Sequence, residues 1–91
     1  MDQITIPVWY IFTGKRIESL VTITVPKEDC GYGAILRIFG QIKNSISRPP
    51  NTTRIDMIFV YIGSELCGRI ETVMLYEILR KTGVNLQVVW I

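Results

Sequence analysis

The stretch IDMIFVYI at residues 55–62 carries seven large apolar or aromatic side chains in eight positions and is followed by Gly63 and Ser64. Several of these residues are β-branched, which favours a strand. A strand with no polar face is predicted to be buried on both faces. The rest of the chain must then supply neighbouring strands and a cover for each face of the sheet.

Two strand-like runs and one helical run precede this stretch. Residues 4–12 alternate loosely and residues 17–25 more cleanly, with a turn at 13–16 in which Gly14 supplies a positive φ. From Gly33 to Ile46, apolar residues recur at spacings of three and four, which predicts a helix capped by Asp29. Gly40 inside this helix costs about 1 kcal/mol relative to alanine, so it is expected to mark a close approach to a strand.

The residues after the opening stretch predict one more helix and one more strand. Residues 63–68 are predicted to form a loop with a glycine at each end, and a second helical or irregular stretch begins at Arg69 or Ile70. Arg80 and Lys81 stand where a helix C-terminus favours cations, and Gly83 is a plausible residue just after it. Residues 84–91 alternate and are predicted to be the last strand.

The order of these elements predicts a single α+β domain over residues 1–91. A hairpin, a crossing helix, a strand, a second helical stretch and a last strand, in the order ββαβαβ, are typical of a ubiquitin-like β-grasp roll. In that arrangement the last strand lies parallel to the first. A ferredoxin-like split βαβ sandwich has the same number of elements and is the alternative, but a hairpin before any helix favours the β-grasp.

Composition excludes several classes of protein. Of the 91 residues 48% are apolar and 20% charged, and the net charge of +2 gives no electrostatic case for nucleic acid or an anionic membrane as main partner. No apolar run reaches the roughly 18 residues that span a bilayer, and residues 1–7 lack the features of a signal peptide, so an intracellular location is expected. With no histidine and two cysteines, expected to be free thiols, we expect no metal site or other cofactor.

Catalytic groups are also sparse, so the chain is predicted not to be an enzyme. Glu28 and Asp29 are adjacent carboxylates, but that position suits helix capping better than acid–base chemistry. Cys30 and Cys67 have no histidine to activate them, although a thiol-dependent enzyme stays a weak alternative. Asp56 in the opening stretch is expected to pair with Arg54 or another cation.

Parts of residues 17–62 resemble a known family. The segment VPKEDCGY at 25–32, the apolar residues of 35–42, the segment PNTTRI at 50–55 and Tyr61 are similar to the N-terminal domain of plant Mutator-like transposases and their domesticated relatives. Those domains are β-grasp modules akin to Phox/Bem-type interaction domains. The resemblance implies a non-enzymatic protein-interaction module, in the nucleus or the cytoplasm. It also implies that Lys15 and Arg16 present positive charge to an acidic partner, whereas an ordinary solvated turn is the other reading.

The hairpin offers a second candidate contact surface. Trp9 and Leu20 are expected on the outward faces of the two hairpin strands, a common protein-binding surface in ubiquitin-like rolls. If a second helix covers that face, both residues belong to the core instead. The high apolar content of so small a chain predicts a homo-oligomer or an obligate protein partner.

One further class of function remains open. A small viral protein, either a matrix-like structural subunit or a single-stranded nucleic-acid binder, is the main alternative. For nucleic acid the relevant residues are cations beside an exposed aromatic, namely Arg37, Lys43, Arg48 and Arg54.

Overall fold

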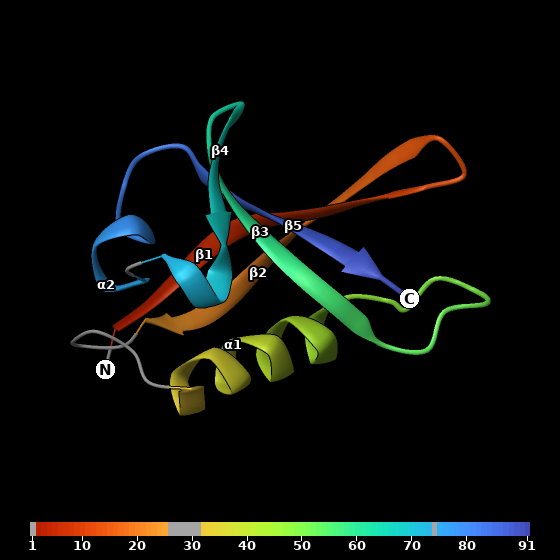
Figure 1. Cartoon of the computed structure of the whole chain (residues 1–91), viewed down its shortest axis with the longest axis horizontal. Helices are drawn as coiled ribbons and strands as arrows, with labels where there is room; N and C mark the ends of the chain where they lie inside the picture. Colours follow the sequence, from red (N-terminus) through yellow and green to blue (C-terminus); the bar gives the residue numbers. More distant parts are fainter. Residues whose placement is uncertain (1, 26–31, 74) are drawn as a thin grey trace.

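The domain combines a mixed five-stranded sheet with one long helix and is therefore an α+β protein (Figure 1). The computed structural model describes residues 2–25, 32–73 and 75–91. Along the chain the elements are β1 (Asp2–Phe12), β2 (Lys15–Val25), α1 (Tyr32–Ser45), β3 (Ile55–Ile62), β4 (Glu65–Arg69), the 3-10 helix η1 (Ile70–Thr72), α2 (Leu75–Ile78) and β5 (Val84–Trp90). The strand order is β2-β1-β5-β3-β4, with β1 parallel to β5 and the other neighbours antiparallel.

The hairpin of β1 and β2 is longer and its turn tighter than the sequence predicted. The strands pair without interruption from Asp2 opposite Val25 to Phe12 opposite Lys15. Only Thr13 and Gly14 remain in the turn, both with positive φ (51° and 77°), which suits the right-handed twist of the flanking strands. The predicted turn at 13–16 is therefore too long, and Lys15 and Arg16 belong to β2.

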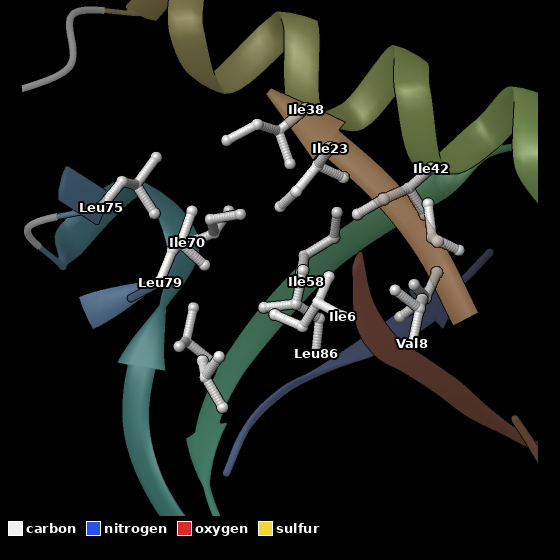
Figure 2. Packing of buried hydrophobic residues seen from close by; sticks show 14 of the residues in the cluster. Ile6, Val8, Ile23, Ile38, Ile42, Ile58, Ile70, Leu75, Leu79 and Leu86 are labelled. Atoms are coloured by element: carbon white, nitrogen blue, oxygen red, sulfur yellow. The ribbon is translucent and has the colours of Figure 1, made fainter. Parts of the chain in front are cut away.

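Helix α1 forms where the apolar periodicity predicted it and packs on one face of the sheet (Figure 2). Ile35, Ile38 and Ile42 are buried against side chains of β1, β2, β3 and β5. The prediction for Gly40 is wrong, because a Cβ added there would meet no atom within 4 Å. The predicted cap Asp29 lies outside the described residues.

Strand β3 is buried on one face only, so the expectation of two buried faces is wrong. Ile58 and Val60 point into the core, whereas Phe59 and Tyr61 on the other face are half-buried. The middle strand of the sheet is β5, and β3 lies between β5 and β4. Asp56 is exposed and is the extra residue of a bulge between the pairs Ile55–Trp90 and Met57–Val89, which accounts for a carboxylate in this strand without a buried ion pair.

The region after β3 differs most from the prediction. The predicted loop at 63–68 contains β4, so the predicted order ββαβαβ lacks one strand. The predicted second helix is also too long, because the structure has only η1 and the four-residue α2 in this region. Val73 is extended (φ −106°, ψ 157°) and interrupts the helix. Ile70, Leu75 and Leu79 are nevertheless buried and close one end of the core (Figure 2).

Candidate functional site

No other element among residues 2–25, 32–73 and 75–91 covers the face of the sheet opposite α1. We call it the outer face and define it by the side chains that alternate with the buried ones: Thr5, Pro7, Trp9 and Ile11 on β1; Arg16, Glu18, Leu20 and Thr22 on β2; Asn85, Gln87 and Val89 on β5; and Phe59 and Tyr61 on β3. Each of these side chains is exposed or half-buried. The alternative in which a second helix covers Trp9 and Leu20 is therefore wrong for the part of the chain that the structure describes.

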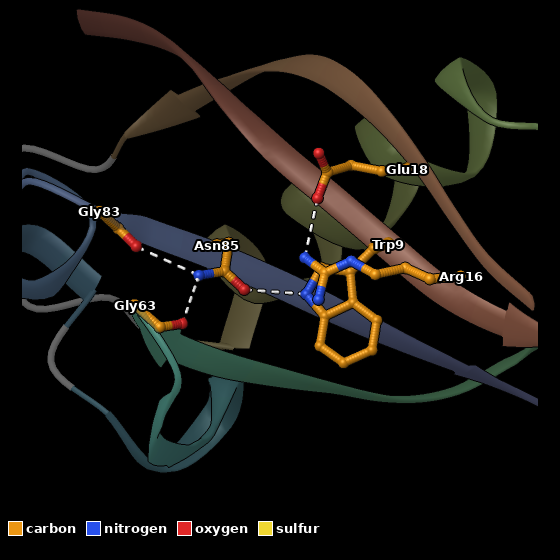
Figure 3. Close-up of polar contacts among 6 residues, drawn as sticks. All are labelled: Trp9, Arg16, Glu18, Gly63, Gly83 and Asn85. Atoms are coloured by element: carbon orange, nitrogen blue, oxygen red, sulfur yellow. Dashed lines mark hydrogen bonds and ion pairs between the residues drawn. The ribbon is translucent and has the colours of Figure 1, made fainter.

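Trp9 lies at the centre of the outer face in a set of polar and aromatic contacts (Figure 3). The guanidinium carbon of Arg16 stands 4.1 Å from the centroid of the indole, a cation–π distance. Glu18 accepts a hydrogen bond of 2.8 Å from Arg16 Nη2 and holds it there. On its other side, the indole lies 5.7 Å from the ring of Tyr61, centroid to centroid. Trp9 is thus a half-buried, fixed platform under a cation, and less exposed than the sequence suggested.

Asn85 ties this platform to two turns of the chain. Its Oδ1 accepts a hydrogen bond of 2.8 Å from Trp9 Nε1. Its Nδ2 donates to the carbonyl oxygens of Gly63 (3.0 Å) and Gly83 (3.1 Å), which belong to the turns before β4 and β5 (Figure 3). Gly63 N in turn donates to Gly83 O at 2.9 Å. One side chain therefore connects β1, β5 and both turns, and fixes the edge of the indole.

Lys15 and Arg16 do not form one basic patch. Consecutive strand residues point to opposite faces of a sheet. Arg16 lies on the outer face over Trp9, whereas Lys15 stands opposite Phe12, a residue packed against the core on the helix side. Both belong to the projecting end of the hairpin, but only Arg16 contributes to the outer face.

Leu20 is the most exposed apolar residue of β2, at 72%. It stands opposite Pro7 in the register, next to the pair Thr5 and Thr22, whose hydroxyl oxygens are 3.1 Å apart. Ile11 on β1 is 54% exposed on the same face. The outer face thus has an aromatic centre with side-chain contacts around it and exposed apolar side chains beside it.

The described residues do not bring together the groups of a typical catalytic or metal site. There, no three or more Cys, Asp or Glu side chains come together in a way that could hold a metal ion. A hollow of about 390 Å³ beside β1 and β2 is lined by Arg16, Glu18 and Lys81 among others, a set with charged groups but no hydroxyl or thiol nucleophile paired to a base. Cys67 is exposed, and Cys30 lies outside the described residues.

The cations of the nucleic-acid alternative lie away from Trp9. Arg37 and Lys43 belong to α1, which covers the opposite face of the sheet. Arg48 and Arg54 are exposed on the segment that joins α1 to β3. The structure therefore does not align these four residues beside the aromatic side chains of the outer face. Within the described ranges, no helix combines the length and the hydropathy needed to cross a membrane.

Of the four predicted contact residues, Trp9, Arg16 and Leu20 lie on the outer face and Lys15 does not, whereas Asn85, Tyr61 and Glu18 beside Trp9 were not predicted. The sequence gives only a weak signal for Asn85. Its amide stands in a strand of mostly apolar residues, and a half-buried tryptophan needs an acceptor for its N–H, which an asparagine oxygen can supply. The parallel pairing of the first and last strands was predicted, but that Asn85 meets Trp9 follows from its register, in which Trp9 stands opposite Gln87, and the sequence does not reveal that register.

Comparisons with models of protein families, with curated proteins and with solved structures give no match. The resemblance to transposase N-terminal domains thus stays a prediction from the sequence.

Proposed function

We propose that this domain is a non-enzymatic protein-interaction or self-association module of the ubiquitin-like, β-grasp type. Two features support the fold assignment. The strand order β2-β1-β5-β3-β4 has the first and last strands parallel and adjacent, and one long helix crosses a single face of the sheet. Both are features that the β-grasp prediction required.

The observation that carries the function is the uncovered outer face with its fixed centre. Trp9 is held by Asn85 and covered by Arg16, so its position costs no further ordering when a partner binds. Leu20 beside it exposes 72% of its surface and gains most from being covered. Ordered aromatic and arginine side chains beside exposed aliphatic ones are the usual composition of the centre of a protein interface.

A mass measurement with two matched variants tests this proposal. Light scattering of the wild type is run from about 1 µM to 1 mM, the range in which small interfaces associate, beside Leu20→Asp and Leu36→Asp. Leu36 is a comparable exposed leucine, at 52%, on α1 and off the outer face. We expect the wild-type mass to rise above one chain of 10.4 kDa, Leu20→Asp to abolish the rise and Leu36→Asp to leave it unchanged.

Two other outcomes would change the proposal. A mass of one chain throughout the range would remove self-association and leave contact with a different protein. If Leu36→Asp abolished the rise and Leu20→Asp did not, the contact surface would be α1 and the outer face would be refuted as the site.

A further inference from the structure

Strand β2 is an edge strand with unpaired backbone groups. Among the described residues, its only neighbour in the sheet is β1. Thr24 N donates a hydrogen bond of 2.8 Å to Gln41 Oε1 of α1, so this amide points away from β1. In an antiparallel ladder, the N–H and C=O groups of every second residue point to the same side of the strand. The edge away from β1 therefore also carries the backbone groups of residues 16, 18, 20 and 22. Pro7, which has no N–H, stands opposite Leu20, in agreement with a pair that exchanges no hydrogen bonds with β1.

The two edges of the sheet differ in how they are protected. Strand β4 at the other edge has five residues and a bulge at Cys67, which lies between the pairs Val60–Gly68 and Tyr61–Leu66. Short strands and bulges discourage pairing with another chain. Strand β2 has eleven residues in unbroken register with β1, and Gln41 covers it at Thr24. The stretch from Arg16 to Thr22 is therefore the part of the sheet best suited to accept another strand.

Side chains along this stretch also favour a partner. Leu20 is 72% and Ile17 38% exposed, one on each face of β2. The charges of Arg16 and Glu18 are paired with each other and drawn over Trp9, towards β1 and away from the edge. Charged side chains usually guard an edge strand by standing along it, and here their arrangement leaves the edge accessible.

We propose that the partner is a second copy of this chain, whose β2 pairs antiparallel with the first β2 about a two-fold axis at Ser19. This inference rests on the proposed function, because it names the partner and the contact of a self-associating module. The result would be one continuous sheet through both copies, with about eight hydrogen bonds across the new ladder.

The position of the two-fold axis follows from which residues each possible axis would place opposite each other. An axis at Glu18 would set the two Glu18 carboxylates opposite each other, which is destabilising. An axis at Leu20 would set Arg16 opposite Thr24, whose amide is already bonded to Gln41. An axis at Ser19 pairs Arg16 with Thr22 and Glu18 with Leu20, and so uses every free group from 16 to 22.

The same register covers the exposed apolar side chains. On the helix side Ile17 would stand opposite Val21 of the second copy. On the outer face the two Leu20 side chains would be diagonal neighbours across the axis, at about 7–8 Å between their Cα atoms. Because the new contact is limited to one strand from each copy, the interface is small, and dissociation in the micromolar range is expected.

Disulfide trapping tests the register. Residues opposite each other in a non-hydrogen-bonded antiparallel pair have Cα atoms about 4.5 Å apart, within the range that a disulfide spans. In a chain carrying Cys30→Ser and Cys67→Ser, Ser19→Cys should therefore form a cross-linked dimer under mild oxidation. Ile17→Cys is the matched control: the two copies of residue 17 would be offset by four positions, about 13 Å along the strands, and should not cross-link.

A proline and an alanine variant test the ladder separately from the outer face. Leu20→Pro and Leu20→Ala both remove the exposed leucine, but only proline removes the outward N–H, and an edge strand tolerates it. Both variants lose the apolar contact of Leu20, so we expect Leu20→Pro to weaken the dimer about thirtyfold more than Leu20→Ala does, through the two hydrogen bonds that only proline removes. Circular dichroism and thermal melting of each variant verify that the monomer is folded.

The outcomes separate the edge pairing from the more general proposal. If the wild type self-associates but Ser19→Cys does not cross-link, or if proline and alanine weaken the dimer equally, the edge pairing is overturned and association through the outer face stands. If the wild type stays at one chain up to about 1 mM, far above the micromolar range expected here, self-association by either surface is overturned.

Discussion

Replacing Asn85 by alanine is expected to lower the free energy of unfolding by about 2 kcal/mol. The side chain accepts one hydrogen bond from Trp9 and donates two, to Gly63 and Gly83. A net hydrogen bond contributes about 1 kcal/mol, but the two carbonyl partners lie in exposed turns where water replaces the lost donor, so the sum is about 2 and not 3. Against a total stability of about 5–15 kcal/mol for a small domain, this is a large loss.

The assay is urea unfolding followed by tryptophan fluorescence, with thermal melting as a second measurement. A loss of about 2 kcal/mol corresponds to a fall in Tm of about 8–16 °C for a domain of this size. Gln87→Ala is the control: Gln87 lies two residues further along β5 on the same face and accepts one hydrogen bond, of 3.1 Å, from Tyr61. Its loss should stay under about 1 kcal/mol. Equal losses for the two variants, or a loss under about 0.5 kcal/mol for Asn85→Ala, would refute the connecting role of Asn85.

Three other predictions address the helix, the core and the nucleic-acid alternative. Gly40→Ala should raise the free energy of unfolding by about 1 kcal/mol, because a Cβ there meets no atom within 4 Å and alanine favours the helix. Gly83→Ala should lower it, because φ is 84° at that position. Midpoints of urea unfolding that moved in the opposite directions would contradict this. Ile38→Ala should cost about 2–5 kcal/mol by the same assay, since Ile38 is fully buried under the sheet, and a loss below about 1 would mean that α1 packs loosely. On heparin at low salt the protein should not be retained, given a net charge of +2; retention that falls steeply with salt would favour nucleic-acid binding instead.

The elements that the sequence predicted well are those whose side-chain period matches a single buried face. β2 buries every second residue at Val21, Ile23 and Val25, and α1 buries residues three and four apart. Strand β4 has no such pattern, since its residues are exposed or half-buried at an edge. Without a buried face there is no periodicity to detect, and β4 forms because β3 offers it a backbone ladder.

The same limit explains the error about β3. Its continuous apolar run predicts two covered faces, yet the side chains on the second face are half-buried by those of neighbouring strands. Tyr61 reaches Trp9 and Gln87, and Phe59 stands opposite Gln87 in the register. Aromatic side chains can shield one another across strands without a covering helix. Apolar content in a strand therefore indicates shielding from water, and only the tertiary structure shows whether a second layer or adjacent strands provide it.

The position of Arg16 changes how its charge should be tested. A basic hairpin tip implies that Lys15 and Arg16 act together, but one residue of offset puts them on opposite faces of β2. Arg16 is paired with Glu18 and stacked on Trp9, so removing it also uncovers the indole. Lys15 is exposed and has no such structural role in the described contacts. A double substitution would mix a loss of charge with a change of the outer face, whereas Lys15→Gln alone removes the charge, keeps most of the aliphatic stem, and isolates any contribution of the tip to binding an acidic partner.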